Sequence, residues 1–118
     1  DPVGRPIELG YSLLPWARNQ GREYEYVQGW LKAVWAEGID AGSKSGMQSI
    51  VECAGLNWNE AKSILGNQDW RHEAEANRLE MMKHGVWGVP SFRVGKTVTW
   101  GQDRLWVIEH ALQKLTKT

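Results

Sequence analysis

The stretch GVWGVPSF, residues 85–92, places a proline where a short strand would begin, and this limits how the chain can fold. Proline offers no N–H to a strand ladder, so it is expected at a strand's first residue, at an edge or at a bulge. One interpretation is purely local: Gly85 ends a helix, Gly88 allows a tight turn and Pro90 begins a strand. The other is that the Val89–Pro90 peptide is cis, which would turn the backbone N–H and C=O of Val89 outward. An extended peptide could then pair with them as an added strand.

A second stretch, WGQDRL at residues 100–105, precedes the last apolar helix pattern. Gln102 or Asp103 can serve as the N-cap of that helix without any further function. A helix start also leaves N–H groups free, and these favour a bound carboxylate. Because Asp103 adds a negative charge beside them, the two features together could hold a zwitterion.

Length and charge bound the class of protein. The 118 residues suit one domain of ordinary size. Lys plus Arg and Asp plus Glu number 14 each, so the charge balance gives no reason to expect a nucleic-acid or acidic-membrane partner. No apolar run approaches the roughly 20 residues of a membrane span, and no basic-then-apolar leader opens the chain. We therefore expect a soluble domain.

Cysteine and histidine usage argues against redox and metal chemistry within these residues. Cys53 is the only cysteine, which excludes an internal disulfide or a CxxC pair and favours a reducing compartment, the cytoplasm. The surrounding MQSIVECAGL resembles an apolar helix face, so we expect Cys53 to be buried. His72, His84 and His110 lack the i, i+4 spacing of a helical zinc site, and no metal is expected.

The hydrophobic period predicts a run of helices followed by a hairpin and a last helix. Pro15 should end or kink the first helix, and Asn57 should cap the fourth, with Glu60 as its capping-box partner. Gly95-Lys96 should form a type II′ turn between SFRV and TVTW. The helices are expected over residues 7–20, 22–37, 45–54, 58–65 and 69–84, and again after Gly101.

The helix over residues 22–37 carries a regular apolar pattern. Its members stand at i, i+3, i+7, i+10 and i+11, which is the spacing of one helix face. The residues of that face are Tyr24, Val27, Leu31, Val34 and Trp35.

Together these motifs resemble a known family. GVWGVPSF followed by a hairpin and by WGQDRL is similar to the C-terminal signature of the 2-hydroxychromene-2-carboxylate isomerase family, which is related to the kappa-class glutathione transferases. WLKAVWAEGID, residues 30–40, resembles that family's helical insertion. The ordered combination of GVPSF and WGQDR is the most specific part of the resemblance.

The resemblance implies an α/β, thioredoxin-like fold of the DsbA type that is mostly helical. Residues 1–84 would form an inserted α-helical domain, and residues 85–118 the C-terminal strand–strand–helix unit. The N-terminal βαβ half would be absent, so the chain would be a C-terminal portion of its parent. A second copy could supply part of the lost packing, which makes a homodimer an expected assembly.

The resemblance also implies a cofactor site for glutathione. Pro90 matches the family's cis-proline, and Val89 would offer its backbone to the cysteinyl part of the tripeptide. Gln102 and Asp103 match the positions that hold the γ-glutamyl end, with Trp100 and Gly101 leading into them. The family's catalytic serine would lie in the missing N-terminal part, so no catalytic residue is expected in this chain.

The leading hypothesis is therefore the C-terminal part of a glutathione-dependent isomerase acting on 2-hydroxychromene-2-carboxylate or a similar aromatic-degradation intermediate. Its partners would be glutathione and a small aromatic carboxylate, and the chain alone would be inactive. Two enzymatic alternatives are a DsbA-like thiol–disulfide oxidoreductase and a kappa-class glutathione transferase. A third alternative is a non-catalytic helical binding module.

Four further apolar residues, two tryptophans and two methionines, are interpreted from their sequence context. Trp30 and Trp35 are expected to pack the insertion helix onto its neighbours, with the alternative that either borders the pocket of an aromatic substrate. Met81 and Met82 are expected to fill the core.

Overall fold

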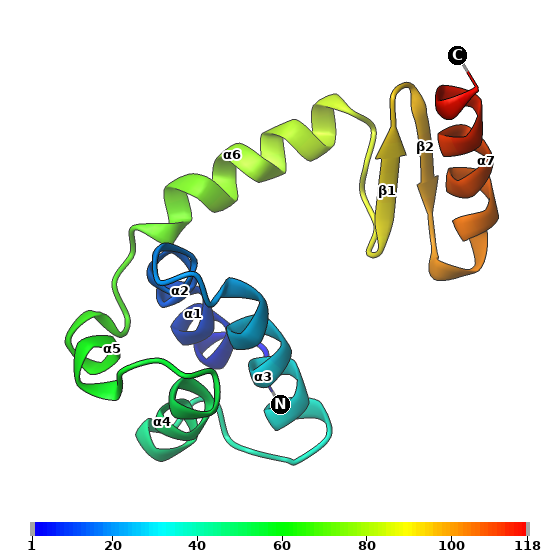
Figure 1. Cartoon of the computed structure of the whole chain (residues 1–118). Helices are drawn as coiled ribbons and strands as arrows, with labels where there is room; N and C mark the ends of the chain where they lie inside the picture. Colours follow the sequence, from blue (N-terminus) through cyan, green and yellow to red (C-terminus); the bar gives the residue numbers. More distant parts are fainter. Residues whose placement is uncertain (1, 118) are drawn as a thin grey trace. The chain divides into compact units, whose positions relative to one another are not determined.

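The computed structural model describes residues 2–117, which divide into two compact units (Figure 1). Unit 1 ends at Arg71 and unit 2 begins at His72. Each unit is described by itself. The expected domain boundary between residues 84 and 85 stays a prediction, because compactness alone does not define a domain.

The regular secondary structure of unit 1 is all helical among its described residues. Pro15 lies in the first turn of the second helix, where its missing N–H interrupts no helical hydrogen bond. The helix expected over residues 7–20 is therefore two helices that meet at Leu13, one of the two outcomes that Pro15 allowed. The helices are α1 (Arg5–Ser12), α2 (Leu14–Asn19), α3 (Glu23–Trp35), α4 (Lys44–Cys53) and α5 (Trp58–Ile64).

Side-chain caps fix where the last two of these helices begin. The Gly46 N–H donates to Ser43 Oγ over 3.0 Å at the start of α4. The Glu60 N–H donates to Asn57 Oδ1 over 3.1 Å at the start of α5. The predicted Asn57 cap is thus confirmed.

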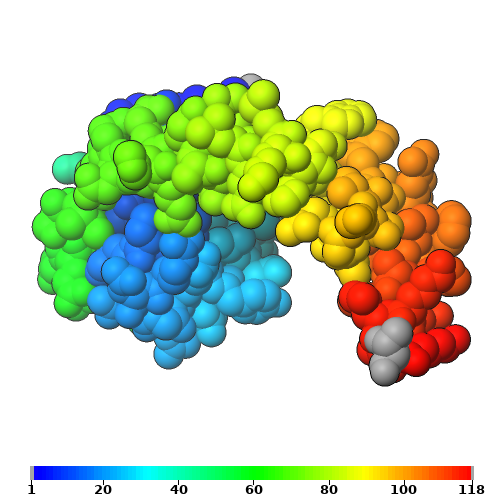
Figure 2. All heavy atoms as spheres, turned by 90° about the horizontal axis from the view of Figure 1, so that it is seen from above, coloured from blue at the N-terminus to red at the C-terminus, as the bar shows by residue number. Residues whose placement is uncertain are grey.

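The core of unit 1 is built around α4, whose residues Met47, Ile50 and Val51 and C-cap residue Ala54 stand at i, i+3, i+4 and i+7. In the space-filling view of Figure 2, the atoms of these helices, coloured blue to green, lie closely packed at the surface. The buried cluster comprises Leu13, Ala17, Tyr26, Ala33, Ala41, Met47, Ile50, Val51, Ala54, Leu56 and Ala61.

Cys53 is exposed, so the expectation that it is buried was wrong. It lies six positions after Met47, well off the face that α4 turns to the core. The surrounding sequence is apolar because Ile50, Val51 and Ala54 form the buried face, and Cys53 lies outside that face.

The apolar face that the spacing marks on α3 is largely exposed. Tyr24 and Trp35 are 72% and 70% exposed, and Val27 and Leu31 are 39% and 44% exposed. Only Val34 of that set packs against the core.

The rotation of α3 is set by a different group of residues. Tyr26 is buried, and its hydroxyl donates to the Gly10 C=O over 2.6 Å. Ala33, seven positions later, is also buried, and Trp30 between them packs partly against the core. A buried, hydrogen-bonded tyrosine and a small alanine therefore define the inner face of α3, and Trp35 turns outward.

Unit 2 contains a long helix, except for its first two residues, together with a hairpin and a closing helix. The strands pair antiparallel from Ser91↔Trp100 to Val94↔Thr97. Gly95 has a φ of +58°, and Lys96 has no positive φ, as the predicted type II′ turn requires. The closing helix packs against both strands (Figure 1). The elements are α6 (Trp70–Lys83), β1 (Ser91–Val94), β2 (Thr97–Trp100), the 3-10 turn η1 (Gln102–Arg104) and α7 (Leu105–Thr116).

The helix α6 contributes no buried residue to either unit's core. Met81 and Met82 are 38% and 63% exposed, so the expectation that they fill the core was wrong. The reason is the polar sequence around the whole circumference of α6, which offers no continuous apolar stripe. Among the described residues, no helix combines the length and the apolar character needed to cross a bilayer.

Candidate functional site

The peptide bond between Val89 and Pro90 is cis, as the sequence predicted. The Val89 side chain is 87% exposed. Within residues 2–117, neither the N–H nor the C=O of Val89 has a hydrogen-bond partner. A hydrogen bond from the Ser91 hydroxyl to the Gly88 C=O, 2.5 Å long, closes the turn that contains Val89 and Pro90. A short backbone edge is thus open to an extended ligand.

The hairpin register brings the second candidate stretch to this edge. Ser91 pairs with Trp100, and the Gly101 N–H donates to the Pro90 C=O over 2.9 Å. Val89 precedes Pro90 and Gln102 follows Gly101, so this hydrogen bond holds Val89 and Gln102 near each other. The six residues singled out in the sequence therefore lie together at one end of the hairpin. They are Val89, Pro90, Trp100, Gly101, Gln102 and Asp103.

The 3-10 turn η1, which leads into the closing helix α7, offers free donors and a free carboxylate. Arg104 donates its N–H to the Gly101 C=O over 3.3 Å, but the amides of Gln102 and Asp103 have no partner among the described residues. A Cβ on Gly101 would lie 2.5 Å from Asp103 Oδ1, and Gly101 has a φ of +98°. Glycine is therefore required there, and the Asp103 carboxylate lies over its backbone. The arrangement suits a ligand that carries both charges.

Two tryptophans form a stacked pair beside the cis bond, and sequence reasoning missed the partnership. The rings of Trp87 and Trp100 lie 5.2 Å apart at 26°. Trp87 is 77% exposed, and a Cβ on Gly88 would overlap Trp100 Cδ1 and Nε1. The glycine directly after Trp87 was the available signal, since a glycine within a turn often marks the close approach of another group.

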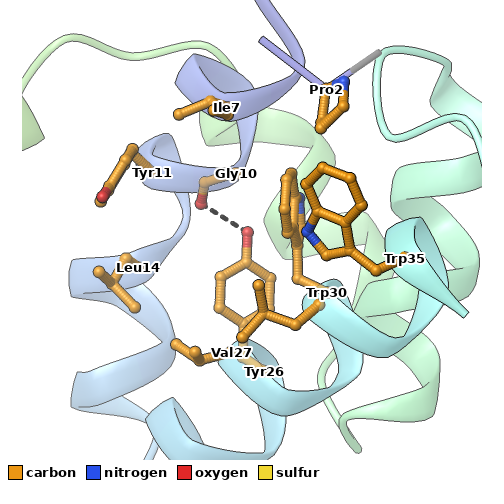
Figure 3. A pocket seen from close by; sticks show the side chains of 10 residues that line it. Pro2, Ile7, Gly10, Tyr11, Leu14, Tyr26, Val27, Trp30 and Trp35 are labelled. Atoms are coloured by element: carbon orange, nitrogen blue, oxygen red, sulfur yellow. Dashed lines mark hydrogen bonds between the residues drawn. The ribbon is translucent and has the colours of Figure 1, made fainter. Parts of the chain in front are cut away.

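A separate cavity of about 440 Å³, which we name the α1–α3 pocket, lies within unit 1 (Figure 3). Both Trp30 and Trp35 line this pocket. Trp35 is 70% exposed, so the expectation that it packs onto neighbouring helices was wrong. Burial raises the pKa of the Tyr26 hydroxyl above its ordinary value, which keeps this wall neutral. The lining residues are Pro2, Ile7, Gly10, Tyr11, Leu14, Tyr26, Val27, Trp30, Leu31 and Trp35.

Metal chemistry finds no support in the geometry. Among residues 2–117, no group of three or more His, Cys, Asp or Glu side chains is arranged to hold a metal ion. The expected absence of a metal remains a prediction.

A cis-proline before an antiparallel hairpin, with a helix packed on both strands, defines the closing unit of a thioredoxin-like fold. The family model described as a DSBA-like thioredoxin domain matches residues 8–113, and the chain belongs to that family. The predicted fold class is confirmed.

Two curated relatives match most of the chain. It is 26% identical over 97 residues to a 2-hydroxychromene-2-carboxylate isomerase from Sphingobium xenophagum, covering 82% of this chain and 50% of the relative. It is 27% identical over 92 residues to a 2-hydroxychromene-2-carboxylate isomerase from Pseudomonas putida, covering 78% and 45%. The chain thus spans about half the length of these relatives. No solved structure matches it.

Proposed function

We propose that this chain supplies the glutathione-binding part of a glutathione-dependent isomerase. Its substrate would be 2-hydroxychromene-2-carboxylate or a similar aromatic-degradation intermediate. Family membership and the names of the two relatives support this class of enzyme. The observation that carries the proposal is the Gly101–Pro90 hydrogen bond, which joins the open backbone of Val89 to the free amides of Gln102 and Asp103.

The residues at the hairpin end fit the tripeptide group by group. The Val89 N–H and C=O pair with the cysteinyl residue as a short added strand. The amides of Gln102 and Asp103 donate to the γ-glutamyl carboxylate, and the Asp103 carboxylate accepts from the ammonium. Glutathione, when bound, supplies the thiol that adds to the substrate. The chain's own part is to bind it and fix its orientation.

The rest of the enzyme would lie outside these residues. By the family resemblance, we infer a catalytic serine upstream of these residues, so the 118-residue chain alone should show negligible turnover. The presence of a single cysteine supports a cytoplasmic setting.

Replacing Asp103 tests the zwitterion site. Asp103→Ala should weaken glutathione binding by about 1–3 kcal/mol, the usual range for a hydrogen bond to a charged group. Isothermal titration of the chain with glutathione, before and after the substitution, measures the change.

The matched control is Glu109→Ala, which removes an exposed carboxylate from α7 of the same unit. It should leave glutathione affinity unchanged. If both substitutions weakened glutathione binding equally, Asp103 would contribute only through the net charge of the chain and not through a direct contact. An absence of glutathione affinity in the unaltered chain would favour the non-catalytic binding module instead.

The second candidate is thiol–disulfide exchange, favoured by the match to the DSBA-like domain model. Cys53 lies at the end of α4 in unit 1 and has no second cysteine in this sequence, so a redox pair would have to come from elsewhere. Catalysed reduction of insulin disulfides by the parent enzyme, without isomerase activity, would establish this candidate over the first.

A further inference from the structure

We propose that the α1–α3 pocket is a binding site for an uncharged, planar aromatic ring system of about two fused rings. The pocket belongs to unit 1 and shares no residue with the hairpin site of unit 2. Its assignment to the ring of the isomerase substrate rests on the proposed function, whereas aromatic binding as such does not.

The size and the walls of the pocket fit such a ligand. Its volume of about 440 Å³ lies near the lower end of the range of about 300–1,000 Å³ for small-molecule sites. In Figure 3 the Trp30 and Trp35 indoles lie on one side of the opening, with Tyr11 and Leu14 on the other. Aromatic side chains facing an apolar cavity favour stacked or edge-to-face contacts with a flat ring.

The inner wall is fixed before any ligand arrives. Tyr26 is held by its hydrogen bond to the Gly10 C=O. A Cβ on Gly10 would lie 2.8 Å from Trp30 Nε1 and 3.2 Å from Trp30 Cε2, so only glycine lets this indole lie against α1. Two rings are therefore positioned by α1, and their arrangement costs little further ordering on binding.

The charge of the lining selects the ligand class. No charged side chain is among the described residues that line the pocket. Trp30 Nε1 is buried and lacks a hydrogen-bond partner in the described residues. A carboxylate placed inside would lose its hydration without gaining a cation, so a charged substituent would have to stay at the rim. The rim itself is apolar and open, with Tyr11 46%, Leu31 44% and Trp35 70% exposed.

A small molecule fits these features better than a second copy of the chain. The site is a concave cavity of ligand size rather than a flat apolar face, and its floor is already rigid. A dimer through this face is kept as an outcome of the test.

The experiment is a titration of the ¹⁵N-labelled 118-residue chain with 2-naphthol, followed by nuclear magnetic resonance. The indole N–H signal of Trp30 should shift along a saturating curve, because the Trp30 ring lines the pocket. The charged analogue 2-naphthoate should bind no tighter than 2-naphthol, since it gains no cation in the pocket.

A matched pair of variants tests the location. Trp35→Ala removes an outer wall and should raise the Kd for 2-naphthol about tenfold. Trp106→Ala removes an indole of nearly equal exposure, 68%, from α7 and should leave the Kd unchanged. Because both side chains are largely exposed, circular dichroism should show both variants folded.

Several results would overturn the pocket assignment. These are an unshifted Trp30 signal up to the solubility limit, equal effects of the two variants, or a dimer in sedimentation experiments that Trp35→Ala dissociates. A glutathione titration of the same sample separates this proposal from the proposed function. Binding of 2-naphthol without glutathione would leave the pocket standing and reject the function, and the reverse result would reject the pocket alone.

Discussion

At the scale of single residues, close approaches between backbone and rings decide the geometry of both candidate sites. Gly88 accommodates Trp100 in unit 2, and Gly10 accommodates Trp30 in unit 1. In each case the glycine lacks the atom that would displace an indole. The conformational freedom of glycine is secondary here, since neither residue has a positive φ.

Gly88→Ala should therefore disrupt the Trp87–Trp100 stack. The new methyl would overlap the Trp100 indole, whose ring must then turn away. We expect a loss of about 0.5–1.5 kcal/mol, the value of an aromatic pair beyond its buried area. Urea unfolding gives the energy, and near-ultraviolet circular dichroism reports the stack.

The control for this substitution is Gly29→Ala in α3, where the added methyl meets no atom within 4 Å. It should stabilise the chain by about 0.5–1 kcal/mol through helix propensity. An unchanged aromatic signal in Gly88→Ala would show that the stack does not depend on the glycine.

Tyr26→Phe tests the hydrogen bond that orients α3. At neutral pH the loss of the bond to the Gly10 C=O should cost about 1 kcal/mol. Burial raises the pKa of Tyr26 in the folded state, so the unfolded chain releases this proton first as the pH rises. The stability is thus retained below a pH of about 10, the ordinary pKa of tyrosine, and falls above it towards the raised pKa.

Unfolding measured as a function of pH checks both parts. Tyr26→Phe should flatten the alkaline loss of stability, and Tyr24→Phe, at a side chain that is 72% exposed, should not. Equal pH profiles for the two variants would contradict the role given to Tyr26.

At the scale of elements, start and stop signals predicted the helices better than apolar spacing predicted their faces. The Asn57 cap, the break at Pro15 and the hairpin turn follow from local chemistry and are confirmed. The inner face of α3 does not, because it is chosen by the contact between Tyr26 and Gly10, which are 16 residues apart.

Asn57→Ala should weaken the start of α5. The Glu60 N–H would lose its acceptor, at a cost of about 1 kcal/mol. Asn77→Ala is the control, because Asn77 is exposed within α6 and is not a cap. Thermal unfolding should show a lower Tm for the first variant only, and equal shifts would argue against the cap.

At the scale of the whole molecule, burial is concentrated in one unit. All members of the described buried cluster belong to unit 1, whereas Thr99 in β2 is the one buried residue among the described residues of unit 2. Regions with few buried contacts open locally at low free energy. Unit 2, which carries the proposed glutathione site, is therefore the less protected part.

Hydrogen exchange should reproduce this difference. The slowest amides are expected in α3 and α4, and those of β1 and β2 should exchange sooner. Exchange followed by mass spectrometry resolves the two units. Equal protection of the hairpin and of α4 would contradict the uneven distribution of the core.

The candidate site could be predicted from the sequence to the extent that it is local. Short sequence motifs predict the cis bond and the helix start, and the hairpin register between them follows from a two-residue turn. For the α1–α3 pocket, the sequence indicated only that Trp30 or Trp35 could border a cavity. The rest of its wall depends on how α1 packs against α3. Packing between elements is what a single sequence leaves open.

The most direct test of the central proposal maps glutathione onto the backbone of the labelled chain. The amide signals of Val89, Gln102 and Asp103 should shift along one common binding curve. The dipeptide Cys-Gly, which lacks the γ-glutamyl group, should still move Val89 and leave Gln102 and Asp103 in place. A folded chain in which glutathione shifts none of these amides, or shifts them along separate curves, would contradict the proposal.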